Sequence, residues 1–293
     1  MIIKSKGERA FDIFNIFLMI LLTVMFIYPA VLIVCASFSS AGTLTQYGYS
    51  LFIREFSLSS YEYLFTAQDL FLRSMGNSLF MTLLGTFFMV ITTSLYAYAV
   101  SRKRLVFKKF FVIILVIPML FAGGTIPYYL VINGLGLMNT QWAIILPFSV
   151  NAWYIMLSKN FFGSLPDALV ESAQIEGANN VQILYKIILP LGFPIMATII
   201  FYSRVAIWND WFQAMLFIDS SHKQLWPIQS VVREMETNFS SLVSSIGGGS
   251  TLGLNSEGIK SAAVVISTLP IILAYPFLQR YFINGVLMGS VKE

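Results

Sequence analysis

The chain has 293 residues, of which 57% are hydrophobic and 11% charged, and its mean hydropathy is +0.76. Soluble domains carry about a quarter charged residues, so this composition excludes an ordinary soluble domain and indicates an integral membrane protein. A net charge of +4 would suggest a nucleic-acid partner in a soluble protein, but the basic loops of a membrane protein explain it better. We therefore expect no nucleic-acid partner.

The first predicted span follows a basic N-terminal segment that contains Lys4, Lys6 and Arg9. The uncharged run covers about residues 13–38, too long for the core of a signal peptide, and no small-residue cleavage site ends it. The polar residues up to Arg73 are predicted to be external. The single cysteine, Cys35, lies in the apolar run, so neither a disulfide within the chain nor a cysteine-based metal site is expected.

A second span is predicted over about residues 74–101, since roughly 20 residues at 1.5 Å each cross a hydrocarbon core of about 30 Å. Five basic residues follow it with no acid between them: Arg102, Lys103, Arg104, Lys108 and Lys109. Short loops of this kind stay in the cytoplasm. Over the whole predicted topology, twelve of the 18 lysines and arginines lie inside and six lie outside or near the outer ends of spans, which predicts that both termini are cytoplasmic.

Residues 110–158 carry no charge, and one straight helix of that length would measure about 74 Å, so the run must fold back. The only turn-like cluster within it is at residues 133–140, which predicts spans at about 110–132 and 141–160. A fifth span is predicted at about 187–208 and a sixth at about 260–280, with an external loop between them whose tip is Gly247–Ser250. The predicted fold is all-α and polytopic, with six transmembrane helices.

A polar segment, residues 164–190, separates the fourth and fifth predicted spans. Ser164 and Asp167 have the spacing of a capping box, and Pro166 suits a first turn, so a short amphipathic helix is predicted there. Its more apolar side comprises Leu165, Ala168, Leu169, Ser172 and Ile175, and its polar side Asp167, Glu171 and Gln174. Gly177 is predicted to end this helix, and Asn179-Asn180 to cap the next one.

This segment also carries a family resemblance. Glu171-Ser172-Ala173, then Gly177, then Ile187 to Pro190 resembles the Glu-Ala-Ala-x3-Gly-x9-Ile-x-Leu-Pro motif of bacterial ABC-importer permeases, with Ser172 as the one departure. In that family the segment is a cytoplasmic coupling helix that docks in a groove of an ATPase subunit. The resemblance implies ATPase-coupling roles for six residues: Asp167, Glu171, Ser172, Ala173, Glu176 and Gly177. An ordinary amphipathic linker between two spans is the alternative.

The resemblance extends over nearly the whole chain and is strongest to the carbohydrate branch of these permeases, including the smaller permease of the maltose importer. It rests on Tyr28-Pro29, Asn77-Ser78 and residues 96–102, 134–140 and 285–292. It implies a subunit of a sugar or oligosaccharide importer in the bacterial cytoplasmic (inner) membrane, surrounded by membrane lipid. The implied partners are a second homologous permease, two ATPase subunits and an extracytoplasmic sugar-binding protein. ATP and Mg would be bound by the ATPase, and this chain would bind no cofactor.

The sequence contains no energy-converting or catalytic motif of its own. No Gly-x4-Gly-Lys-Ser/Thr loop occurs, and Gly247–Ser250 lacks the lysine. The predicted spans contain no carboxylate for ion coupling, and the sole histidine, His222, reads as a polar loop residue rather than part of a hydrolase site. We therefore expect no enzyme activity and no metal site. An ion-coupled secondary carrier that works without an ATPase is the main alternative, and a membrane scaffold or enzyme is a third.

A second constellation lies at the outer end of the fifth predicted span, where Arg204 precedes the sequence Trp-Asn-Asp-Trp. Aromatic rings stack on sugar rings, and Asn or Asp side chains bind hydroxyl groups. The substrate-path candidates are Trp208, Asn209, Asp210 and Trp211, with Tyr128 and Asn133 as weaker ones. The alternative is an interfacial aromatic belt with a snorkelling arginine. Basic residues of the external segments are mixed with acids, so their charge does not single out an acidic sugar.

Overall fold

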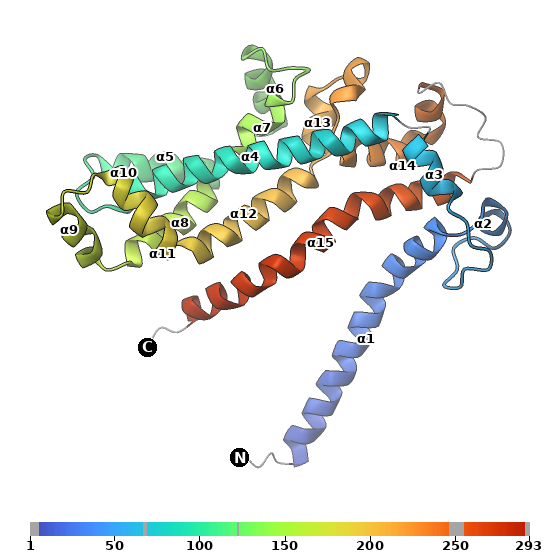
Figure 1. Cartoon of the computed structure of the whole chain (residues 1–293), viewed down its shortest axis with the longest axis horizontal. Helices are drawn as coiled ribbons and strands as arrows, with labels where there is room; N and C mark the ends of the chain where they lie inside the picture. The colour runs from blue at the N-terminus through green and yellow to red at the C-terminus, as the bar shows by residue number, and fades with distance from the viewer. Residues whose placement is uncertain (1–5, 67–68, 122, 246–254, 291–293) are drawn as a thin grey trace. The chain divides into compact units, whose positions relative to one another are not determined.

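The computed structural model describes residues 6–66, 69–121, 123–245 and 255–290, and most of these residues are helical (Figure 1). Within the described residues there is no β-strand, and a single isolated bridge pairs Ser39 with Phe56. The all-α prediction is therefore confirmed. The chain divides into two compact units, Met1–Asp69 with Glu234–Thr268, and Leu70–Arg233 with Leu269–Glu293.

The first unit contains α1 (Lys6–Ser37), α2 (Ala41–Tyr47) and α3 (Ser59–Thr66), and it shares α14 (Ile228–Ser245) and α15 (Ser256–Ser290) with the second unit. The Ser37 hydroxyl lies 2.8 Å from the Tyr61 hydroxyl, and the Phe38 ring stacks on Tyr61 with centroids 4.9 Å apart. Tyr49 donates a 2.8 Å hydrogen bond to Glu257 at the start of α15. The predicted external segment is thus folded rather than a loose loop.

The second unit is built on α4 (Asp69–Ser101) and α12 (Phe193–Trp208), which pack against each other. At Gly85 the helices approach so closely that a Cβ would lie 2.9 Å from Ile207 Cδ1. Around this pair, α5 (Lys108–Leu120) contacts α8 (Ala152–Ser164), which also contacts α12. At the other end, α13 (Phe212–Phe217) contacts α6 (Thr125–Gly134) and α7 (Trp142–Phe148), and η2 (Ser220–Leu225) leads to α14 (Figure 1).

Three described helices are long and apolar enough to cross a membrane: Ala10–Ser37 in α1, the whole of α4, and Ser256–Pro276 in α15. They overlap the predicted first, second and sixth spans. A fourth crossing is possible where Asn180–Leu191 and Phe193–Trp208 form a pair of helices bent by 82°, in the region of the predicted fifth span. The apolar window of α1 is not buried against the rest of the chain, so its side chains are available to lipid or to another subunit.

The predicted third and fourth spans are each divided between two shorter helices. In the third, α5 ends before Gly124, which has a φ of +82°, and α6 follows. In the fourth, α7 ends before Asn151, whose side chain caps α8 by accepting from the Tyr154 backbone amide at 3.1 Å. The expectation that residues 133–140 form the only turn in this run was therefore wrong. That turn itself is present, with positive φ at Gly136 and Asn139. The predicted tip Gly247–Ser250 lies outside the described residues.

Candidate functional site

The polar segment between the fourth and fifth predicted spans forms α9 (Asp167–Ile175), which ends in a Schellman motif. The Gly177 amide donates to Gln174 O at 3.0 Å, and the Ala178 amide donates to Ala173 O at 2.9 Å. Gly177 has a φ of +82°, a conformation that glycine adopts without the strain that a Cβ would add. The predicted stop at Gly177 is confirmed.

The next helix, α10 (Asn180–Ile183), begins with a reciprocal capping box. The Asn179 side chain accepts from the Gln182 amide and the Gln182 side chain accepts from the Asn179 amide, both at 2.9 Å. The predicted cap at Asn179 is confirmed. The chain continues through a π-helical turn, η1 (Leu184–Ile188), and α11 (Leu189–Leu191), and bends at Gly192 into α12. After the turn and cap at residues 176–179, a path of consecutive helical turns therefore leads into α12.

The capping box predicted at the start of α9 was wrong. Ser164 is the last residue of α8, and its hydroxyl donates back to Phe161 O at 2.8 Å. Pro166 stands at the N-cap position and makes no side-chain cap. The Asp167 carboxylate instead pairs with Lys103 of the basic loop at 2.6 Å. The serine was available to close one helix or to open the next, and the structure uses it for the first.

The side of α9 that packs against the chain differs from the predicted apolar side. Val170 and Ala173 are each only 7% exposed and join a core formed with α4, α8 and α12. Leu169, in contrast, is 39% exposed and Ile175 is 88% exposed. The helix thus rests on its small buried residues and presents a mixed face to the outside, which includes Glu171, Ser172 and Glu176.

The basic loop after α4 holds the start of α9 electrostatically. The hydrogen bond and charge of Lys103 lower the pKa of Asp167, and the same contact raises the pKa of Lys103. The Arg102 guanidinium donates to Phe162 O at 3.1 Å and lies 5.0 Å from the centroid of the Tyr98 ring. A pocket of about 510 Å³ opens between this loop, α9 and α10, and Glu171 is among the residues that line it.

At the other end of α12, the four predicted substrate-path residues do not share one environment. Trp208 is only 5% exposed, so it is a packing residue and not an open stacking surface, contrary to the prediction. The Asn209 side chain is exposed, and its backbone amide caps α12 by donating to Val205 O at 3.1 Å. Trp211 is 39% exposed, and the Arg233 guanidinium lies 5.1 Å from the centroid of its ring. Trp211 is therefore the aromatic surface that remains open.

Asp210 is half-buried beside Gln213, which sequence reasoning missed. One Asp210 carboxylate oxygen accepts from the backbone amide of Gln213 at 3.5 Å. The other carboxylate oxygen is buried and has no hydrogen-bond partner among the described residues. Burial raises the pKa of Asp210 to about 6. The Tyr128 hydroxyl donates to the Gln213 side chain at 2.9 Å, so Tyr128 joins this group. In the described structure no contact brings the exposed Asn133 side chain to it.

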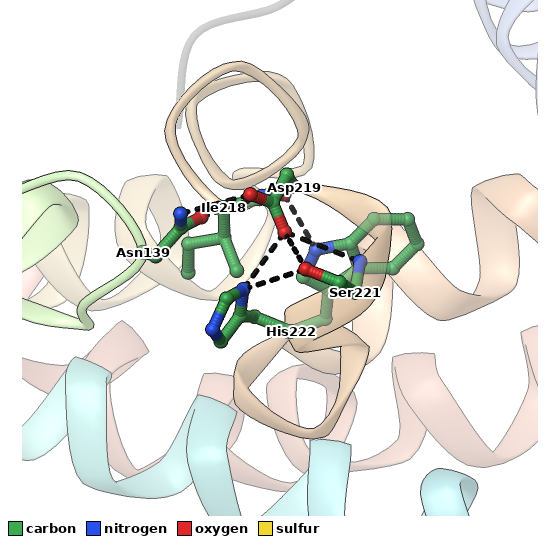
Figure 2. A network of polar contacts seen from close by, with 6 residues as sticks. Asn139, Ile218, Asp219, Ser221 and His222 are labelled. Atoms are coloured by element: carbon green, nitrogen blue, oxygen red, sulfur yellow. Dashed lines mark hydrogen bonds and ion pairs between the residues drawn. The ribbon is translucent and has the colours of Figure 1, made fainter.

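Asn139 and Asp219 form a polar clamp near this end of α12 (Figure 2). The Asn139 side-chain amide donates to the Asp219 carboxylate at 2.8 Å, and the Asp219 backbone amide donates to Asn139 Oδ1 at 2.9 Å. Ser221 and His222 contact the other carboxylate oxygen, and these contacts, Ser221 first, lower the pKa of Asp219. The clamp ties the turn after α6 to the segment after α13, and His222, predicted to be a loop residue, lies in the short 3-10 helix η2.

Comparison with known proteins places this geometry in a family. Residues 89–287 match the family described as "Binding-protein-dependent transport system inner membrane component". Protein LplC of Bacillus subtilis is 40% identical, with 99% of this chain and 97% of that protein covered. The polygalacturonan/rhamnogalacturonan transport system permease protein YtcP of the same organism is 37% identical, with 97% and 99% covered. A crystal structure of a bacterial ABC transporter that imports the acidic polysaccharide alginate contains a chain with a TM-score of 0.88 and 29% identity, with 96% of this chain and 100% of that chain covered.

Proposed function

The chain belongs to the family of binding-protein-dependent transport system inner membrane components, and we propose that it forms half of a saccharide path whose movement is driven by a separate ATPase. It is a permease subunit of a sugar ABC importer. YtcP and the alginate importer act on sugar polymers or their fragments, which supports an oligosaccharide as the substrate here.

The observation that carries the coupling part of the proposal is the way α9 is mounted. Its inner side, Val170 and Ala173, packs into a core shared with α4, α8 and α12. Its outer side exposes Ile175 and Glu171. A partner that docks on the outer side and moves would displace α9, and a close-packed core transmits such a displacement to the helices that it contacts. In this proposal α9 is the coupling helix, and Asp167, Glu171, Ser172, Ala173, Glu176 and Gly177 form or shape the ATPase contact.

The complete importer proposed here contains this permease, a second homologous permease, two ATPase subunits and an extracytoplasmic sugar-binding protein. ATP and Mg would be bound by the ATPase subunits, because this sequence has no phosphate-binding loop. The permease would lie in the bacterial cytoplasmic membrane with six spans, of which the third and fourth are interrupted, and with both termini in the cytoplasm. The basic loop after α4 and α9 would then lie on the same, inner side.

On the outer side, the candidate path residues are Trp211, Asn209 and Asp210 with Tyr128, supported by Gln213. The open face of Trp211 can stack on a sugar ring, and the amide and carboxyl groups can bind hydroxyls that leave water. Trp208 would act indirectly, by packing the end of α12. Asn133 remains a candidate on the same turn as the clamp.

The test of this proposal is ATP-driven uptake by the reconstituted importer carrying either of two α9 variants. Glu171→Lys reverses an exposed charge on the docking face, and Gly177→Val adds a side chain where φ is +82° and nothing else lies within 4 Å. Strain at such a position costs about 1–2 kcal/mol, which disturbs the turn without a clash. Both variants are expected to reach the membrane but to lose most ATP-driven uptake and ATPase stimulation. Glu62→Lys, an equal charge change at an exposed position of α3, is the control.

Normal uptake by both α9 variants would overturn the coupling assignment. Uptake that follows an imposed ion gradient in liposomes containing this chain without any ATPase would instead favour the secondary carrier.

A further inference from the structure

Arg204 is a cation within α12 that has no counterion among the residues whose side chains the structure describes. It lies four residues before the end of the helix, about 6 Å along the axis from Trp208. Its side chain is exposed, and no hydrogen bond, ion pair or ring contact joins it to any described residue. None of the six predicted spans contains an aspartate or glutamate that could pair with it. A charged group in such a position is costly unless it has a function or reaches water.

The position of Arg204 around α12 argues against simple snorkelling into the lipid headgroups. Ala197 and Trp208 lie on the same side of the helix, seven residues before and four after Arg204, and each is only 5% exposed. This is the side by which α12 packs against protein. Arg204 therefore emerges at the edge of a packed surface, where its guanidinium can face a path between helices.

Aromatic side chains lie one turn further into the span. Phe201 precedes Arg204 by three residues, and its ring lies 5.8 Å from Tyr202 and 6.2 Å from Tyr275 of α15, centroid to centroid. Tyr202, two residues before Arg204, lies nearly opposite to it around α12, so Phe201 and Tyr275, which is 52% exposed, are the rings relevant to Arg204. Such rings stack on the apolar faces of sugars. A guanidinium next to them adds a planar donor fork that matches a carboxylate.

We propose that Arg204 binds the carboxylate of a uronic-acid unit as an acidic oligosaccharide passes along α12, with the Phe201 and Tyr275 rings as the adjacent stacking surface. This inference rests on the proposed function and names the charge class of its substrate. Arg204 is then the residue that makes the path selective for acidic over neutral sugars. The same guanidinium would gain little from a neutral sugar, because hydroxyl groups do not compensate its charge.

The experiment compares uptake of two radiolabelled disaccharides by proteoliposomes that contain the whole importer with its ATPase and binding protein. One substrate is digalacturonate, and the other is the neutral galactose disaccharide with the same linkage. Arg204→Gln is expected to lower digalacturonate uptake at least tenfold relative to the neutral disaccharide, and Arg204→Lys is expected to lower it less, because it keeps the charge but loses the fork. Arg73→Gln, an exposed arginine in the first turns of α4, is the matched control and should leave the ratio unchanged.

Each other outcome has a definite meaning. An equal loss of both substrates in Arg204→Gln, with normal amounts of extracted complex, would assign Arg204 to anchoring in the membrane and overturn the inference. Efficient ATP-driven uptake of the neutral disaccharide alone by the unaltered importer would also overturn it, while leaving the proposed function intact. Absence of ATP-driven uptake of both, together with no stimulation of the ATPase by the loaded binding protein, would reject the proposed function and the inference with it.

Discussion

Gly192 stands where the path from α9 turns into α12, and its replacement by alanine probes that bend directly. The helical pieces on its two sides meet at 82°. An added Cβ would lie 2.6 Å from Phe162 Cε1 and 2.9 Å from Ile188 O, closer than a Cβ approaches other heavy atoms in folded proteins. The φ of Gly192 is −84°, so alanine adds no backbone strain. The effect of Gly192→Ala is therefore steric, and it acts between α8 and the bend.

The size of the effect follows from the environment of Phe162. Its ring is fully buried in the core that also contains Val170 and Ala173, so it cannot swing away freely. Overpacking of this kind costs about 1–3 kcal/mol. If the bend differs between the inward-open and outward-open states, the strain shifts their ratio by a factor of about 5–150. We expect uptake per ATP hydrolysed to fall at least fivefold while the ATPase still responds to the binding protein.

A second substitution shows whether the contact is responsible. Phe162→Leu removes the ring atoms that the new methyl group would meet, so the double variant should transport better than Gly192→Ala alone. The control is Gly163→Ala, since Gly163 has an ordinary φ and a methyl group added there would meet nothing within 4 Å. The reasoning would be refuted by a Gly192→Ala importer that behaves like the Gly163→Ala importer, or by losses in the double variant equal to the sum of the single losses.

Two further predictions concern topology and pH. In a background with Cys35→Ala, a cysteine that replaces the exposed Lys103 should be protected from an impermeant thiol reagent in intact cells. A cysteine that replaces the exposed Ser220 should react. Labelling of Lys103→Cys from outside would contradict the proposed orientation. Burial holds the pKa of Asp210 at about 6, above its ordinary value of 3.8, so the folded protein binds this proton more tightly than the unfolded chain. The stabilising effect of the proton is present at acid pH and is lost as pH rises through about 4 to 6. The unfolding midpoint of the unaltered complex should therefore fall relative to that of Asp210→Asn as the pH rises over that range. A difference between the two midpoints that does not change with pH would reject the assignment.

The features that could be predicted from sequence are those coded within a few residues. A glycine after an amphipathic stretch and an asparagine three residues before a glutamine each complete their hydrogen bonds locally, so Gly177 and Asn179 have the predicted roles. The prediction for Ser164 was wrong because a serine between two helices can form a hydrogen bond with either one. Here its hydroxyl bonds to the Phe161 carbonyl group of the preceding helix. A short sequence motif predicts its structure well when only one hydrogen-bond partner is available to it.

The features that could not be predicted depend on contacts between distant residues. The periodicity of α9 marked Ile175 as apolar, but it is the small Ala173 that fits against α4 and α8, and Ile175 is left outside. Trp208 looked like an exposed aromatic at a membrane boundary and proved to be buried. The roles of Gln213 and Arg233 depend on contacts with Tyr128 and Trp211, which lie far from them in the sequence. No spacing rule connects Trp211 with Arg233, which lies 22 residues later.

The continuity of the chain from α9 to Trp211 would let the proposed ATPase contact at α9 act on the proposed path residues at the far end of α12. After the Schellman turn at Gly177, every peptide up to Gly192 belongs to a turn, cap or helix, so little slack can absorb a displacement. The π-helical turn, Leu184–Ile188, continues directly into α11, so it adds no loop to this path. Beyond the bend, the 16 residues of α12 form a rod of about 24 Å. A rotation of this rod about Gly192 would move Arg204 and the end at Trp208 by more than it moves Met196, because displacement grows with distance from the pivot. In the proposed mechanism the bend, rather than the docking face itself, would be where a small movement of α9 becomes a large one at the residues proposed to bind sugar.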